Sequence, residues 1–331
     1  MPVNPVLVET TRGDRVESQH RGAFVVIDAK GSIVAQRGDV ERPVYPRSAV
    51  KLLQALPLVE SGAADAFGFG NRELALACGS HSGEPEHIET AKAMLAAAGL
   101  GEGDLECGSH WPFIKQSVLI EFAAAGHEPH QLVNNCSGKH AGFLCLAAHL
   151  GVEPTGYTSP DHAVMRTLRD TLQEVTGVPH SDDVLGVDGC GIPNWAIPLK
   201  AMAAAYARLG SGEGMTAERA SAAKRLLAAT MAEPWYVAGT RRHDMLLMEA
   251  APHLVHVKTG AEGVYCASLP TLGLGIALKI DDGNTRAAEC AVSAIVGKLL
   301  ENEAVSAMAH RTLRNWNGAV VGEMRAVEAM E

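Results

Sequence analysis

The spacing of hydrophobic and polar residues changes twice along the chain. Near the start, two short apolar runs flank the turn residues 28–31 in "GAFVVIDAKGSIVAQRG", which predicts a β-hairpin. After Pro46 the apolar residues between Val50 and Leu58 recur at helical spacing and stop at Gly62, which predicts a helix. Strand-like runs return late in the chain, at "HLVHVKTG", "GVYCASL" and "GLGIALKID".

The middle of the chain is predicted to be mainly helical. Helical periodicity with recognisable starts or stops predicts helices over residues 85–98, 139–150, 160–175, 193–209 and 216–231, and a last amphipathic helix over 285–300. Loops rich in glycine and cysteine separate them, namely "CGSHSGEPEH", "NNCSGKHAG" and "VDGCGIPNW". We expect "NGAVVGEM", near the end, to add an edge strand.

Strands at both ends of a helical middle predict an α+β fold. We expect the strand-rich residues 1–45 and 250–331 to form one antiparallel sheet, with the mainly helical residues 46–249 inserted as a lobe. No linker-like stretch divides the chain. We therefore expect residues 1–331 to fold as a single α+β unit.

Composition excludes several classes of function. The net charge is −10 and no basic run is present, which argues against nucleic-acid binding. No apolar run reaches membrane-spanning length, and no apolar segment follows basic residues near the N-terminus. The seven cysteines are scattered without a tight framework. Thiols are therefore expected, and with them a cytoplasmic protein.

Candidate chemistry first appears in "YPRSAVKLLQALP", where Ser48 precedes Lys51 by three residues. Residues at this spacing share a helix face. A lysine desolvated near a helix N-terminus has a lowered pKa and can take the proton of an attacking serine. The alternative is that Ser48 caps the helix and Lys51 is solvated. A second such pair, Ser221 and Lys224, lies within a helical run, so the spacing alone decides little.

Other motifs in the chain favour the pair Ser48 and Lys51 over the pair Ser221 and Lys224. Serine hydrolases of the penicilloyl type join S-x-x-K to a second serine motif and a strand-borne K-T-G. The one K-T-G of this chain, Lys258 to Gly260, follows the strand-like "HLVHV". Ser80 and Ser82 in "ACGSHSGEPEH" are candidates for the second serine. A turn with a helix cap is an equally good interpretation of that loop.

Two cysteine loops suggest a metal site. Cys136, Lys139, His140 and Cys190 would converge if both loops lined one cleft, and two thiolates with a nitrogen suit zinc. The spacing leaves this open, because no C-x-x-C is present and buried free cysteines are common. "CSGKH" is not a phosphate loop, since Val133 stands where its first glycine would be.

Five segments taken together resemble the rhizobial-type L-asparaginases, also called class 3 or asparaginase II: "PRSAVKLLQALPLVESG", "CGSHSGEPEH", "NNCSGKHAG", "VDGCGIPNWAIPL" and "KTGAEGVY". The resemblance spans roughly residues 5–300 in the same order. It implies a fold similar to serine β-lactamases, DD-peptidases and glutaminases. It also implies a homodimer that hydrolyses L-asparagine to L-aspartate and ammonia.

The resemblance implies roles for individual residues. Ser48 would be the nucleophile and Lys51 its partner, with Ser80 and Lys258 as the second serine and second lysine. Zinc would be held by the ligands Cys136, Lys139 and Cys190 and would support substrate binding more than bond breaking, with no organic cofactor. One departure is Leu52, where the family often has proline.

Substrate recognition is assigned from charge. Arg47 is the candidate for the α-carboxylate and Asp188 for the α-ammonium, while His140 would contact the substrate or the surroundings of the metal. The alternatives are a surface arginine, a turn aspartate and a capping histidine. Rival functions are a serine-dependent glutaminase, a β-lactamase-like amidohydrolase, and a non-catalytic protein that binds zinc or an amino acid.

Overall fold

A computed structural model describes residues 3–327, and these fall into two compact units. The first, called here the sheet unit, takes the residues up to 49, 197–213 and those from 246 onward. The second, the helical unit, takes residues 50–196 and 214–245. The expectation of one unit over residues 1–331 is not tested by this grouping and stays a prediction.

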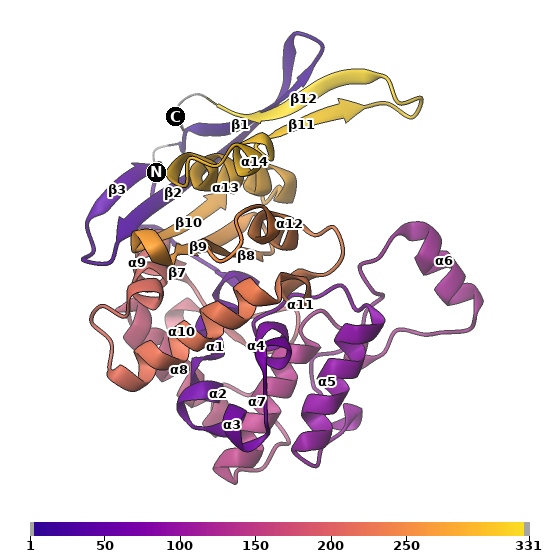
Figure 1. Cartoon of the computed structure of the whole chain (residues 1–331), viewed down its shortest axis with the longest axis vertical. Helices are drawn as coiled ribbons and strands as arrows, with labels where there is room; N and C mark the ends of the chain where they lie inside the picture. Colours follow the sequence, from indigo (N-terminus) through magenta and orange to yellow (C-terminus); the bar gives the residue numbers. More distant parts are fainter. Residues whose placement is uncertain (1–2, 328–331) are drawn as a thin grey trace. The chain divides into compact units, whose positions relative to one another are not determined.

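The sheet unit is built on an antiparallel sheet to which both ends of the chain contribute. Over the described residues its strand order is β11-β12-β1-β2-β10-β9-β8, with β3 also paired to β2 (Figure 1). The predicted α+β class, with N- and C-terminal segments sharing a sheet, is confirmed. The strands are β1 (Val6–Arg12), β2 (Arg15–Asp28), β3 (Ile33–Arg37), β8 (His256–Gly260), β9 (Val264–Leu269), β10 (Leu274–Ile280), β11 (His310–Arg314) and β12 (Val320–Ala326).

The long strand β2 joins the two parts of this sheet. Its first half pairs with β1, and its second half lies between β3 and β10. The predicted hairpin is therefore present, with Gly31 in the left-handed region at φ 88°. Residues 23–27 of β2 and 275–278 of β10 are buried in succession. Both faces of these strands are therefore covered, as in a sheet packed between layers.

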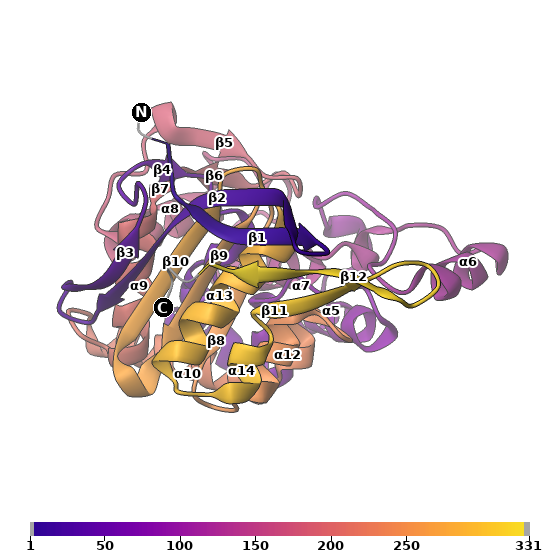
Figure 2. The same ribbon diagram turned by 90° about the horizontal axis from the view of Figure 1, so that it is seen from above.

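Two helices pack against the sheet, α9 (Leu199–Ser211) and α13 (Thr285–Leu299). Figures 1 and 2 show β8, β9 and β10 as neighbouring strands with α13 against them. Glycine at position 275 lets α9 approach closely, because a Cβ there would lie 2.0 Å from the carbonyl oxygen of Ala203. The unit also contains α14 (Glu303–Ala307), and α12 (His243–Ala250) crosses its boundary.

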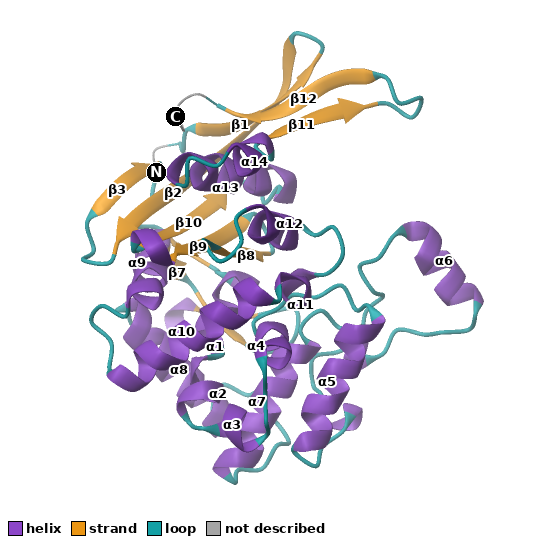
Figure 3. Ribbon diagram, in the orientation of Figure 1, coloured by secondary structure: helices purple, strands orange, loops and turns teal. Residues whose placement is uncertain are grey.

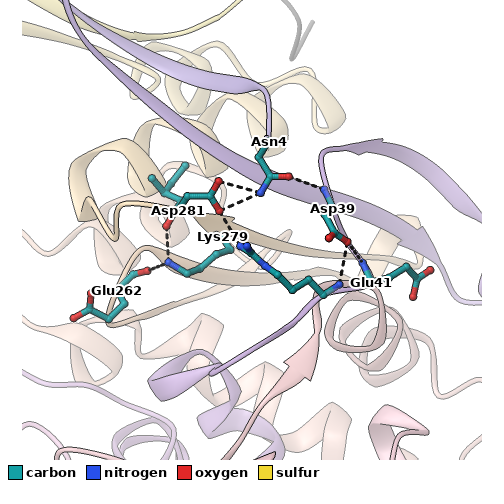
Figure 4. A network of polar contacts seen from close by, with 8 residues as sticks. Asn4, Asp39, Glu41, Glu262, Lys279 and Asp281 are labelled. Atoms are coloured by element: carbon teal, nitrogen blue, oxygen red, sulfur yellow. Dashed lines mark hydrogen bonds and ion pairs between the residues drawn. The ribbon is translucent and has the colours of Figure 1, made fainter. Parts of the chain in front are cut away.

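A polar network fastens the first residues of the sheet unit to its late strands (Figure 4). The Asn4 amide donates to both carboxylate oxygens of Asp281, at 3.1 and 3.0 Å. Its oxygen accepts the backbone N–H of Asp39 at 2.8 Å. Arg42 donates to the same Asp281 carboxylate at 2.9 Å. Segments from the two ends of the sequence are thus held together by side chains as well as by strand pairing.

The helical unit surrounds α7 (Ser137–Leu150), whose residues 137–147 are all buried. Figure 3 shows the helices of this unit in purple. They include α1 (Lys51–Gln54), α2 (Leu56–Glu60), α3 (Ala63–Ala66), α4 (Asn71–Ala77), α5 (Pro85–Ala97), α6 (Gln116–Ala124), α8 (Ala163–Thr176), α10 (Ala217–Ala232) and α11 (Pro234–Ala238). Within a few residues at their ends, five of the seven predicted helices match α5, α7, α8, α10 and α13. The helix expected between Val50 and Leu58 is divided at Ala55 into α1 and α2.

Two predictions of local structure were wrong. The helix expected over 193–209 begins only at Leu199, and short strands precede it: β6 (Pro193–Trp195), which pairs with β5 (Leu185–Val187), and β7 (Ile197–Pro198), which pairs with β4 (Pro43–Val44). Pro193 and Pro198 interrupt helical hydrogen bonding there. The strand expected in "NGAVVGEM" exists as β12, but it is not an edge, because β11 pairs on its other side.

No helix within residues 3–327 has both the length and the apolar character needed to cross a bilayer.

Candidate active site

Ser48 lies in a tight 3-10 turn, Arg47–Val50, that runs directly into α1. The turn is closed by the N–H of Ala49, which donates to the Pro46 carbonyl at 3.0 Å. Tyr206 fixes it from α9 by donating its hydroxyl to the Ala49 carbonyl at 2.5 Å. No side chain caps α1, whose N-cap position is Val50. The interpretation of Ser48 as a helix cap is therefore wrong, and its half-buried hydroxyl serves no such purpose.

Arg47 stands just before the nucleophile candidate in an unusual conformation. Its φ is 52°, in the left-handed region that non-glycine residues rarely adopt. Such strain persists only where the surroundings impose it, and it is frequent at functional sites. The side chain of Arg47 is half-exposed. The structure therefore places a cation beside Ser48 in a backbone conformation that its environment enforces.

The K-T-G triplet forms the end of β8 and lies against the turn that carries Ser48. A Cβ on Gly260 would sit 2.5 Å from the Pro46 carbonyl oxygen and 3.1 Å from the Ala49 nitrogen. Only glycine allows this approach without displacing the turn. Lys258 is fully buried, and its ammonium donates to the Thr259 carbonyl at 2.8 Å. Within the sheet unit, the sequence motifs around Ser48 and Lys258 thus meet.

Lys51 is fully buried in the helical unit, so the solvated alternative is wrong. Its Nζ donates to the Gly79 carbonyl at 2.5 Å and to the Asn135 carbonyl at 3.4 Å. Burial lowers the pKa of Lys51, with the charge of Lys139 acting in the same direction. Negative charge on Cys136 and Cys190 acts against this shift. A lysine with a lowered pKa has a larger neutral fraction, which is the form that accepts a proton.

The loop that follows Gly79 distinguishes its two serines. The Ser82 hydroxyl donates to the Ala238 carbonyl at 3.0 Å. The Ser80 hydroxyl is buried and has no hydrogen-bond partner among the described residues. His81 is held between the Gly83 N–H and the Ser137 hydroxyl, at 3.2 and 3.0 Å, as a structural residue. Ser80 is therefore the member of this loop whose polar group is left for another partner.

Cys136, Lys139 and Cys190 come together in the helical unit. The Lys139 amine donates to Cys190 Sγ at 3.1 Å, and the side chains of Cys136 and Cys190 are hydrogen-bonded. The bond from Cys190 lowers the pKa of Cys136, against the effect of burial, and the charges of Lys51 and Lys139 lower it further. Burial works to lower the pKa of Lys139, but the sulfur charges outweigh it and the pKa is raised. The cluster is thus a buried set of two sulfurs and an amine, held together by hydrogen bonds and by the attraction between sulfur and amine charges.

The two remaining predicted residues flank this cluster in sequence. His140 is fully buried, and its Nδ1 lies 2.6 Å from the Tyr157 hydroxyl. Asp188 is half-buried, accepts the N–H of Gly189 at 2.8 Å, and raises the pKa of Lys139 by its charge. The turn role considered for Asp188 is therefore present alongside its electrostatic one.

The sequence as a whole decides the family. A family model described as L-asparaginase II matches residues 8–326. The chain belongs to the L-asparaginase II family. Membership supports an amidohydrolase activity. A comparison with curated proteins gave no match.

Solved structures are similar to this member of the L-asparaginase II family only at a distance. Mglu in its glutamate form has a TM-score of 0.46 at 14% identity, over 86% of this chain and 62% of that one. A β-lactamase from Mycobacterium bovis, Mb2281c, has a TM-score of 0.41 at 12% identity, over 84% and 94%. The chain thus spans less than two thirds of the length of that Mglu chain. Likeness at this level carries no functional argument.

The donor set of the cysteine cluster fits zinc. Zn²⁺ prefers thiolate sulfur and nitrogen, and a catalytic site leaves one position open. Cys136 and Cys190 supply two sulfurs and Lys139 supplies an amine that must first lose its proton. Among the described residues, no group of three histidine, cysteine or acidic side chains offers an alternative metal site.

Sequence reasoning missed several residues that position this site in the L-asparaginase II family member. The Gly79 and Asn135 carbonyls hold Lys51, Tyr206 holds the Ser48 turn, and Tyr157 contacts His140. Backbone carbonyls leave no mark in a sequence. The two tyrosines lie in a helix and a loop without any motif, so no pattern could have found them.

Proposed function

We propose that the protein hydrolyses L-asparagine to L-aspartate and ammonia, with Ser48 as the nucleophile, as in the rhizobial-type L-asparaginases. The observation that carries the proposal is the contact of the K-T-G strand with the Ser48 turn, marked by the 2.5 Å separation between a Cβ at Gly260 and the Pro46 carbonyl oxygen. Membership of the L-asparaginase II family supports it independently.

The reaction has two stages. Ser48 Oγ attacks the side-chain amide carbon of asparagine and its proton passes to neutral Lys51. The Lys51 ammonium then gives this proton to the leaving nitrogen, so that ammonia departs as the β-aspartyl ester forms. Water then hydrolyses the ester. The lowered pKa of Lys51 suits a base of this kind. Ser80, whose hydroxyl has no partner among the described residues, and buried Lys258 would serve as the second serine and second lysine of the proton relay.

Substrate binding is assigned to groups of matching charge. Arg47 would bind the α-carboxylate and Asp188 the α-ammonium, with His140 as a further contact. Cys136, Lys139 and Cys190 would hold zinc, which when bound supplies a positive charge for an oxygen of the substrate. We assign the zinc to substrate affinity rather than to bond breaking, because the serine and lysines supply the nucleophile and base.

A homodimer in the cytoplasm is part of the same proposal. The resemblance to class 3 asparaginases supports the dimer, which light scattering tests. All seven cysteines are buried and none forms a disulfide, which supports a reducing compartment.

Ammonia release from asparagine and glutamine, with and without a chelator, tests this function. We expect kcat/KM for asparagine to exceed that for glutamine by about 10-fold or more, the usual effect of one methylene. Ser48→Ala should abolish release, while Ser221→Ala, its counterpart in the other S-x-x-K, should not. Preference for glutamine, or hydrolysis of a β-lactam instead, would favour the rival amidohydrolases. Absence of any turnover would favour a binding protein.

A further inference from the structure

Tyr157 belongs to none of the motifs, yet its hydroxyl is hydrogen-bonded both to Glu106 and to His140, the residue that follows Lys139 in α7. The residue is fully buried. Its oxygen accepts the backbone N–H of Glu106 at 3.0 Å and lies 2.6 Å from His140 Nδ1. Burial raises the pKa of Tyr157 well above its ordinary value, so the phenol keeps its proton. With an N–H already donated to it, the hydroxyl directs that proton to His140 Nδ1.

This hydrogen bond fixes the tautomer of His140. His140 Nδ1 lies 2.6 Å from the Tyr157 hydroxyl that donates to it, and a ring nitrogen that accepts a hydrogen bond carries no proton. A neutral imidazole that accepts at Nδ1 carries its hydrogen on Nε2. Nε2 is buried and has no hydrogen-bond partner among the described residues. The Nε2–H of His140 is therefore a donor of fixed orientation that lacks an acceptor among the described residues. His140 directly follows Lys139 in α7.

The turn that carries Tyr157 is itself held from two points. The Glu106 carboxylate accepts the Gly156 N–H at 2.6 Å and the Thr158 hydroxyl at 2.6 Å. These bonds hold the residues on either side of Tyr157, while the Glu106 N–H donates to the Tyr157 hydroxyl. Supporting hydrogen bonds of this kind fix the orientation of a functional side chain.

The same segment also holds the loop of the first cysteine. The Cys107 carbonyl accepts the Asn134 amide at 2.8 Å, and the Asn134 oxygen accepts the Cys136 N–H at 2.8 Å. Gly191 lies against Glu106 as well, since a Cβ there would be 3.5 Å from the Glu106 carbonyl oxygen. Residues 106–107 therefore set the positions of the His140 ring and of the cysteine loops together.

We propose that Tyr157 is a positioning residue that holds His140 as the Nε2–H tautomer, and that this N–H binds an oxygen of the substrate's α-carboxylate. The proposal rests on the proposed function, which makes the substrate an α-amino acid. A carboxylate accepts more than one donor, so a bond from His140 leaves lone pairs for further contacts.

Tyr157→Phe tests this, with Tyr236→Phe as the matched control, because the buried Tyr236 makes no hydrogen bond through its hydroxyl to any residue within 3–327. Without the Tyr157 hydroxyl, His140 is free to protonate at Nδ1. We expect KM for asparagine to rise about 10-fold with kcat within about twofold, the loss of one charged hydrogen bond in binding. Asparagine α-amide, which lacks the carboxylate charge, should show little change. Tyr236→Phe should behave as the wild type with both substrates.

A second variant separates positioning from a general loss of packing. His140→Gln keeps an N–H near the position of Nε2 but has no ring tautomer. Adding Tyr157→Phe to His140→Gln should therefore leave KM unchanged. An additional rise equal to that of the single variant would overturn the tautomer role, and an equal loss for asparagine and its α-amide would overturn the carboxylate contact.

Nitrogen-15 NMR of the histidine rings gives a readout that needs no turnover. The wild type should show His140 with an unprotonated Nδ1 and a protonated Nε2, and Tyr157→Phe should show a mixture of tautomers. A wild-type ring protonated at Nδ1 would overturn the positioning role, whatever the activity. A wild type that fails to hydrolyse asparagine would refute the proposed function and the substrate assignment, while the NMR result would still decide the tautomer.

Discussion

Replacing Gly260 by alanine tests whether the K-T-G strand sets the position of the nucleophile. The new Cβ would lie 2.5 Å from the Pro46 carbonyl oxygen and 3.1 Å from the Ala49 nitrogen, whereas ordinary contacts of carbon begin at about 3.5 Å. Pro46 and Ala49 are joined by the hydrogen bond that closes the Ser48 turn. Relief of the overlap must therefore move the turn, the strand, or both by about 1 Å.

The magnitude follows from that displacement. Overpacking of this kind costs about 1–3 kcal/mol of unfolding free energy. A misplacement of about 1 Å at a reacting group costs about 100-fold in rate. We expect Gly260→Ala to lower both the free energy of unfolding, measured by urea unfolding, and kcat/KM for asparagine by these amounts.

Two control variants separate stability from positioning. A Cβ on Gly297, where α13 meets α14, would lie 2.4 Å from Ser306 Oγ and 2.7 Å from its nitrogen, and Gly103 has no atom within 4 Å of its Cβ position. Gly297→Ala should lose stability but keep its kcat/KM once folded, and Gly103→Ala should keep both. A folded Gly260→Ala with wild-type kcat/KM, or a loss no larger than that of Gly297→Ala, would refute the reasoning.

Three other outcomes are expected. Lys51→Met should lower kcat for asparagine by about 100-fold or more, because it removes the buried amine that accepts the proton; unchanged kcat would exclude Lys51 as the base. A chelator should raise KM for asparagine more than it lowers kcat, and readdition of zinc should reverse this; a loss confined to kcat would contradict the assigned role of the metal. Burial lowers the pKa of His87 below 6.5 in the folded protein, so the unfolded chain takes up the proton first and stability is lost as pH falls from about 6.5 toward the lowered pKa. His87→Gln should weaken that slope in urea unfolding between about pH 7 and pH 5, and a slope identical to the wild type would show that His87 does not contribute.

The pH dependence has a direct structural cause. His87 Nδ1 accepts the Glu84 N–H at 3.2 Å, and its Nε2 lies 3.1 Å from the Trp235 carbonyl. Protonation of His87 at Nδ1 would replace the acceptor of the Glu84 N–H by a donor, so that two N–H groups would face each other. The ring is also stacked on Trp235 at 3.9 Å, which leaves it no room to turn.

The parts of the fold that could be predicted are those in which local pattern and tertiary packing agree. The hairpin around Gly31 needs only a turn and two apolar runs, and α10 follows Thr216, whose hydroxyl accepts the Arg219 N–H as an N-cap. The K-T-G strand was predictable because its apolar run leads straight into the motif. These elements depend on neighbours in sequence.

The missed elements depend on partners far away in the chain. Strand β11 is largely exposed and polar, so its pattern does not indicate a strand, and it forms because β12 offers it hydrogen bonds. The first residues of the helix expected from 193 become strands because Ile197 pairs with Val44. Periodicity cannot anticipate either pairing.

The candidate site shows the same division. Ser48 and Lys51 could be proposed in advance from their spacing together with the K-T-G motif, and the set Cys136, Lys139 and Cys190 from the family resemblance. Their electrostatic state could not. That Lys51 is fully buried, and that it bonds to two carbonyls, follows from the packing of loops that the sequence places 28 and 84 residues away. Tyr157 and Glu106 were missed for the same reason.

The central claim is that Ser48 is the nucleophile, and trapping the ester intermediate tests it most directly. Turnover of asparagine would be stopped with acid, and the digested protein examined by mass spectrometry. We predict that the peptide containing Ser48 carries one β-aspartyl group, and that Ser48→Ala carries none and releases no ammonia. An aspartyl group on another residue, or ammonia release by folded Ser48→Ala at the wild-type rate, would contradict the account.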